Sequence, residues 1–131
     1  MGALAIDHQS YTLDNGLEVL LSEDHDIPVV RVEVWYHVGS KNEVEGRSGF
    51  AHLFEHLMFQ GSEHANADYF VPLQEIGASV NGSTGLDRTN YYEQLSSEYL
   101  PLALWMEADR MGWLLPVLDE ERSTATPPTR W

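Results

Sequence analysis

Residues 50–59 have the sequence FAHLFEHLMF, which predicts a short α-helix that ends before Gly61. Positions four apart on a helix lie on one face, so His52 and His56 can bind the same metal ion through their imidazoles. Glu55 lies on the same helical turn, within reach of a water molecule on that ion. This H-x-x-E-H arrangement predicts a metal site with an adjacent general base.

The chemistry expected of such a site is the activation of water. A divalent metal polarises a substrate oxygen and lowers the pKa of its water toward about 7. Glu55 then accepts the water proton and passes it to the leaving group. The alternative is a solvated polar helix face. We favour a metal site because an unpaired polar cluster is costly to bury in an apolar helix, and this helix also carries Leu53, Phe54, Leu57, Met58 and Phe59.

The composition restricts the class of protein. The 131 residues suffice for one domain with one hydrophobic core. Seven basic against 21 acidic residues give a net charge of −14, so we expect no nucleic-acid partner, and no apolar run is long enough to predict a membrane span. Residues 1–10 lack the pattern of a secretory signal, which favours the cytoplasm without fixing the compartment. Because cysteine is absent, metal ligands must be imidazole nitrogens and carboxylate oxygens.

The remaining sequence predicts strands and two further helices. Residues 10–23 predict a hairpin around Asp14-Asn15-Gly16, and residues 29–38 predict a long strand. On that strand one face carries Val30, Val32, Val34, Tyr36 and Val38. Residues 79–86 and 89–96 predict two more strands. Helices are predicted from 66 or 67 to 76, and from 98 to about 115 with Ser97 as N-cap. The fold class is therefore α+β, a mostly antiparallel sheet with helices packed on one face.

The helix belongs to a longer motif, GFAHLFEHLMFQGS at residues 49–62, that resembles the signature of pitrilysin- and insulysin-type zinc metallopeptidases, the inverzincins. Mitochondrial processing peptidases and small bacterial zinc proteases belong to that group. Further similarity lies in LDNGL at 13–17, GASVNG at 77–82, DRT at 87–89 and EADRM at 107–111, so it covers roughly residues 10–122.

The resemblance implies roles for particular residues. His52 and His56 correspond to zinc ligands and Glu55 to the catalytic base. Asn81 is expected to line the cleft in which substrates of this group lie as an added edge strand. The alternative for Asn81 is a turn residue beside Gly82. The other histidines match no ligand position; they are His8, His25, His37 and His64.

The chain departs from the family pattern at its C-terminal end. The family's third ligand, a Glu, would fall just beyond Trp131. We therefore expect a truncated catalytic domain at residues 1–122, followed by a tail outside the family pattern at 123–131. The sequence does not identify the third ligand of this chain; the candidates are Asp119, Glu120, Glu121, water and a residue of another chain. Imidazole ligands favour zinc, with manganese or cobalt as alternatives.

Several possibilities remain for the function. The first is a metal-dependent hydrolase, which the family makes a zinc endopeptidase. The truncation favours instead small activated esters such as phosphodiesters or phosphotriesters. The other possibilities are an inactive fragment, a metal-binding interaction module, or a subunit that joins a partner domain. We also expect a homodimer, because a shortened domain leaves apolar surfaces and sheet edges uncovered.

Overall fold

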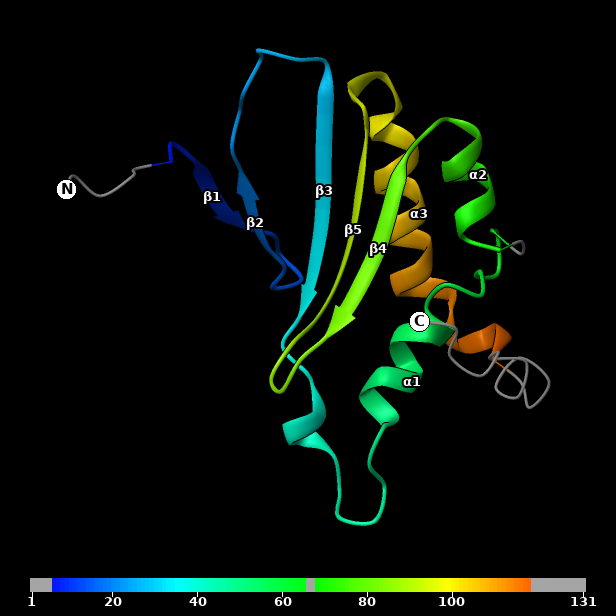
Figure 1. The fold of residues 1–131 in the computed structure, drawn as a ribbon. Helices are drawn as coiled ribbons and strands as arrows, with labels where there is room; N and C mark the ends of the chain where they lie inside the picture. Colours follow the sequence, from blue (N-terminus) through cyan, green and yellow to red (C-terminus); the bar gives the residue numbers. More distant parts are fainter. Residues whose placement is uncertain (1–5, 66–67, 119–131) are drawn as a thin grey trace.

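A computed structural model describes residues 6–65 and 68–118 of the chain (Figure 1). Its strands and α-helices are β1 (Gln9–Thr12), β2 (Glu18–Leu21), β3 (Val29–Tyr36), α1 (Phe50–Leu57), α2 (Phe70–Glu75), β4 (Ser79–Thr84), β5 (Thr89–Ser96) and α3 (Leu100–Trp113). Short 3₁₀ turns are η1 (Ser40–Asn42), η2 (Ser97–Tyr99) and η3 (Leu115–Val117). No helix in these residues is long and apolar enough to cross a bilayer.

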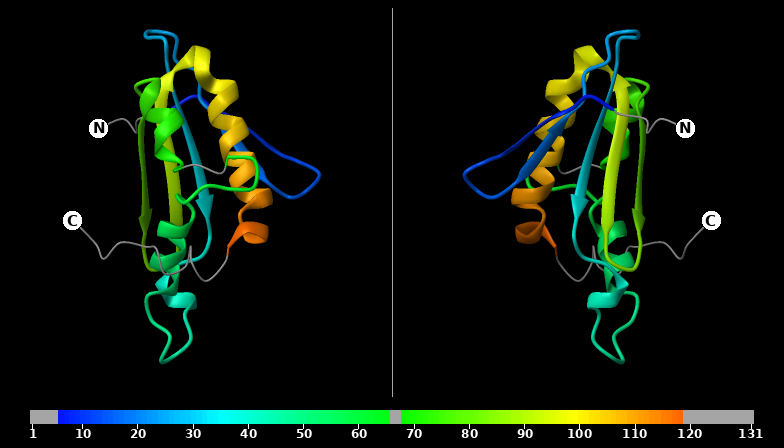
Figure 2. Two further views of the ribbon diagram at one scale, coloured as in Figure 1. Left: turned by 90° about the vertical axis from the view of Figure 1, so that its right-hand side faces the viewer. Right: turned by 90° about the vertical axis from the view of Figure 1, so that its left-hand side faces the viewer.

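The sheet is antiparallel, with β5 between β3 and β4. All three helices lie on the same side of it, as the two side views show (Figure 2). β1 and β2 pair only with each other and form a separate hairpin on the β3 side (Figure 1). This arrangement confirms the predicted α+β class with helices on one face.

The alternation of side chains explains which face of the sheet the helices cover. Trp35 and Arg31 of β3 are exposed, whereas Val34 lies opposite Tyr91 of β5, which is buried under the helices. Tyr91 packs with Met58 and Leu114 in one core cluster. A second cluster contains Tyr69, Leu73 and Met106, and Phe59 packs against both clusters.

Two predicted boundaries of the long C-terminal helix are wrong. Ser97 is not its N-cap: α3 begins at Leu100, with Tyr99 before it and no side-chain cap. Ser97 instead lies in a 3₁₀ turn, and its N–H donates to the carbonyl of Pro28, 3.0 Å away. Pro101 explains the later start, since proline has no N–H and fits only the first turn of a helix. The helix also ends at Trp113 rather than near residue 115.

Other elements are shorter than predicted. α1 ends at Leu57 and not at residue 59, β3 ends at Tyr36, and β4 ends at Thr84. α2 begins at Phe70, whose N–H is accepted by the Asp68 carboxylate at 2.9 Å. The earlier start predicted for that helix, at 66 or 67, is wrong, because Asp68 and Tyr69 are not helical. The predicted boundary between 122 and 123 lies outside the described residues.

A buried polar network joins β5 to α3 beneath this core. The hydroxyl of Tyr69 lies 2.6 Å from Glu93 Oε1 and 3.3 Å from Glu107 Oε1. Arg110 donates to Glu107, and its guanidinium lies 4.4 Å from the Tyr69 ring centre and 4.3 Å from that of Tyr91. Glu107 is thus paired with the guanidinium, and Glu93 joins the network through the Tyr69 hydroxyl. Burial, followed by the hydrogen bond and charge of Glu107, raises the pKa of Glu93 to about 8.

This network predicts a pH-dependent stability. Because the pKa of Glu93 is higher in the folded chain, its contribution is complete at acidic pH and is lost as the pH rises toward 8. We expect Glu93→Gln, which keeps the shape without the charge, to remove this part of the pH dependence. Urea unfolding at several pH values between 5 and 8 measures it, with exposed Glu98→Gln as control. Profiles of the wild type and Glu93→Gln that stay parallel would contradict the assignment.

Candidate metal centre

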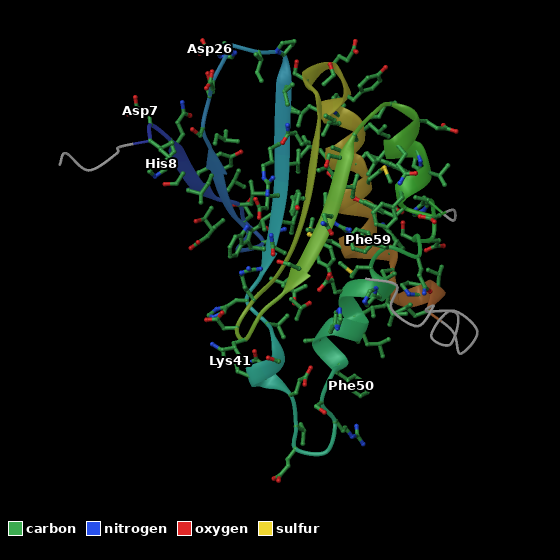
Figure 3. The ribbon with its side chains drawn as sticks, viewed as in Figure 1. Asp7, His8, Asp26, Lys41, Phe50 and Phe59 are labelled. Carbon is green, nitrogen blue, oxygen red and sulfur yellow. The ribbon has the colours of Figure 1, made fainter. Side chains whose placement is uncertain are left out.

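The α1 helix brings its two histidines together. His52 Nε2 lies 3.1 Å from His56 Nε2, and the two rings are 4.7 Å apart at 45°. His52 is exposed and His56 half-buried, so both can contact an ion from solvent. The C-terminal end of the helix is anchored by buried Leu57 and by Met58, which directly follows it. The helix lies between the labelled Phe50 and Phe59 in Figure 3.

The histidine pair fits a zinc ion. Imidazole nitrogens at the usual bond length in a tetrahedral site are about 3.3 Å apart. The observed separation of 3.1 Å is close to that value. In residues 6–65 and 68–118 no third His, Asp or Glu joins the pair. The candidate third ligands Asp119, Glu120 and Glu121 lie outside the described residues.

Glu55 is held against the end of β4. The residue is 9 % exposed, and its Oε2 accepts a hydrogen bond from the Thr84 hydroxyl. The neighbouring Thr89 hydroxyl lies 3.5 Å from that of Thr84 and 3.0 Å from the Val38 carbonyl oxygen. The carboxylate is therefore oriented by the sheet and not by its own helix.

A glycine allows this close approach of α1 to β4. A Cβ atom built on Gly82 would lie 3.2 Å from Phe59 Cε2 and 3.1 Å from Tyr91 Cδ1, closer than side chains normally pack. An alanine at this position would require Phe59 or Tyr91 to shift by a few tenths of an ångström. An open cavity of about 570 Å³ lies at this junction, with His52 and Glu55 on one wall and Gly82 and Thr84 on the other.

Asn81 itself does not line that cavity, although its neighbours from Gly82 to Leu86 do. Its side chain is exposed, and its Oδ1 accepts the N–H of Gly82 at 2.8 Å. The structure therefore brings His52, His56 and Glu55 together and places Asn81 beside them, on the edge strand. A role for Asn81 in substrate binding stays a prediction.

The other histidines lie apart from the cavity. His8, His25 and His37 are exposed. His64 Nδ1 lies 2.6 Å from Asp109 Oδ1, and Ser62 donates to Asp109 Oδ2 at 2.5 Å. Burial alone would raise the pKa of Asp109, but the hydrogen bonds from Ser62 and His64 outweigh it, so the pKa is lowered. This group ties the loop after α1 to α3.

Two residues of the site were not predicted from the sequence. Thr84 orients Glu55, and Glu43 accepts hydrogen bonds from the first residues of α1, at 2.8 Å from Gly49 N and 2.8 Å from Ala51 N. Neither stands at a spacing that marks a local motif. Glu43 is too far before the helix to be recognised as a capping residue, and Thr84 reaches Glu55 only through the packing of α1 on β4.

Comparison with known proteins identifies the family. Residues 18–115 match the insulinase family of peptidases, described as Peptidase family M16. The chain belongs to this family. The match confirms the resemblance on which the zinc ligands and the base were assigned, and it makes the fold a zinc metallopeptidase scaffold.

Individual M16 relatives agree. The chain is 37 % identical over 129 residues to a zinc protease, PqqE, of Helicobacter pylori, and the match covers 95 % of this chain and 29 % of that protein. It is 36 % identical over 98 residues to the mitochondrial-processing peptidase subunit beta of Bos taurus, covering 74 % of this chain and 20 % of that protein.

Solved structures show the same fold. A protease from Helicobacter pylori superimposes with a TM-score of 0.82 at 37 % identity, over 90 % of this chain and 28 % of that one. Pitrilysin superimposes with a TM-score of 0.79 at 32 % identity, over 88 % of this chain and 12 % of that one. The chain thus spans less than a third of the length of these M16 relatives.

Proposed function

We propose that this chain is a metal-dependent hydrolase in which His52 and His56 bind zinc and Glu55 is the general base. The observation that carries the proposal is the 3.1 Å separation of the two Nε2 atoms, with a buried carboxylate on the same helical turn. Membership of the M16 family supports zinc as the ion, since relatives are named zinc proteases.

The residues of the chain divide the chemistry between them. Zinc, when bound, supplies Lewis acidity toward a substrate oxygen and toward water. Thr84 occupies one oxygen of Glu55, so the other oxygen accepts the proton of the attacking water and returns it to the leaving group. Burial of Glu55 excludes competing solvent from one side of the carboxylate.

The free edge of β4 supports a peptide as substrate. Gly85 N–H donates to Arg88 O at 2.7 Å, and hydrogen-bonded pairs alternate along an antiparallel ladder. Gly82 and Thr84 therefore direct their backbone groups away from β5, toward the cavity edge, where an extended peptide can add as a strand. The Gly82 N–H already donates to Asn81 Oδ1, so a peptide that binds this N–H must displace the Asn81 side chain.

Substitution of the base tests the mechanism. We expect Glu55→Gln to bind zinc as the wild type does and to lose about 10²- to 10⁴-fold in turnover, because the amide cannot accept the proton. Turnover is measured on a casein-type substrate and on a nitrophenyl phosphodiester, each with and without chelator. The second substrate tests the alternative of small activated esters.

The matched control for this experiment is Glu75→Gln, an exposed carboxylate of α2 that lies away from the cavity. It should leave turnover unchanged. Activity that survives Glu55→Gln, or that survives chelation of the metal, would refute the proposed function. Loss of activity on only one substrate class by chelation identifies the class that the site hydrolyses.

We further propose that the chain forms a homodimer. Two imidazoles leave zinc coordination incomplete within the described residues, and a second copy can supply a further donor. Apolar side chains also line an open cavity of about 570 Å³ between α1 and α3, among them Phe50, Phe54, Met111 and Leu115. In solution such a surface favours association.

Light scattering at micromolar concentration measures this directly. We expect a mass close to twice the 14.8 kDa of one chain. Leu115→Glu, which places a charge at the rim of that cavity, should lower the mass toward one chain, because an unpaired charge is costly to bury. Glu75→Lys, on the exposed face of α2 and outside that cavity, is the control. A wild-type mass of one chain would exclude the dimer.

A further inference from the structure

We propose that Glu43 is a positioning residue of the metal site: it fixes the start of α1 and thereby the separation of His52 from His56. The inference rests on the proposed function in one respect, the zinc that the two histidines bind. Its basis is the geometry of the loop before α1, which the family assignment does not address.

Both oxygens of Glu43 bind the first turn of the helix. Oε2 accepts the N–H of Gly49 at 2.8 Å, and Oε1 accepts the N–H of Ala51 at 2.8 Å. The first N–H groups of a helix have no partners within it, and the helix dipole favours a negative charge there. The residue at the N-cap position, Gly49, has φ +93° and no side chain, so it cannot supply the cap itself. Glu43 takes that role from six residues away.

The loop that carries Glu43 is itself fixed to the β4–β5 turn. Ser40 N–H donates to Gly85 O at 3.1 Å, and Lys41 N–H donates to Leu86 O at 2.7 Å. A Cβ atom on the preceding Gly39 would lie 2.5 Å from Gly85 O, so only glycine permits this contact. Since Thr84 immediately precedes that turn, one turn of the sheet orients both the Glu55 carboxylate and, through Glu43, the helix start.

His52 depends on this start more than His56 does. It is the third residue of α1 and follows Ala51 directly, whereas His56 is one turn further on, next to buried Leu57. An eight-residue helix is too short to persist without external contacts. Without Glu43, the first turn loses its cap and His52 is the ligand that moves. The hydrogen bonds of Ala51 and Gly49 also lower the pKa of Glu43, which keeps its carboxylate charged.

The experiment compares wild type with Glu43→Gln and Glu43→Ala. Zinc affinity is measured by competition with a chromophoric chelator, and ligand geometry by the visible spectrum of the protein saturated with Co²⁺. Amide hydrogen exchange is followed in α1 and in α3. Glu45→Gln, an exposed carboxylate two residues along the same loop, is the matched control.

We expect both Glu43 variants to bind zinc about 10- to 100-fold more weakly, as is usual when a residue that orients a metal ligand is lost. Their Co²⁺ spectrum should change even at saturation, and α1 should exchange faster while α3 does not. A purely structural role would leave the Co²⁺ spectrum of the saturated protein unchanged. Glu45→Gln should match the wild type in all three measurements.

The outcomes separate this inference from the proposed function. Wild-type zinc affinity and an unchanged Co²⁺ spectrum in both variants would overturn the role of Glu43 while the proposed function stands. A wild type that binds no zinc would overturn the proposed function. In that case, faster exchange in α1 of the Glu43 variants still supports Glu43 as the residue that fixes this helix, and unchanged exchange overturns it.

Discussion

The contact between α1 and the end of β4 is the constraint on which the rest of the site depends. Gly82 has no side chain, so Phe59 packs directly against the strand, and the Thr84 hydroxyl reaches the Glu55 carboxylate. The α1 helix places its two imidazoles on one face, and because it is short this placement depends on contacts with the loop before it. Its carboxylate is useful for proton transfer only if the sheet holds it at a fixed place beside them.

The core beneath that contact is partly polar. Arg110 contacts the rings of Tyr69 and Tyr91 and pairs with Glu107. Glu93, on β5, accepts a hydrogen bond from the Tyr69 hydroxyl. Burying these charges is costly, and the aromatic faces and hydrogen bonds offset part of the cost. The network links β5 to α3. It thereby stabilises the core against which Phe59, just after α1, packs.

Patterns local in sequence predicted most of the fold. The hairpin at Asp14-Asn15-Gly16, the alternation of β3 and the helical H-x-x-E-H motif all follow from neighbouring residues, and the structure places them as expected. The errors arose where distant groups compete with local preference. Ser97 has the composition of a helix cap, yet its N–H is bound by Pro28 and Pro101 sets the helix start. Thr84 and Glu43 contribute through contacts that exist only after α1 has packed.

In the proposed site His52 and His56 bind zinc, Glu55 is the base, and a donor outside the described residues completes the coordination. X-ray absorption at the zinc K-edge of the reconstituted protein tests this most directly. The account predicts one zinc per chain with two imidazole nitrogens at about 2.0–2.1 Å and oxygen or further nitrogen donors in the remaining positions. Substitution of His52 by Ala should remove one imidazole signal. A spectrum without two imidazoles, or one that His52→Ala leaves unchanged, would contradict it.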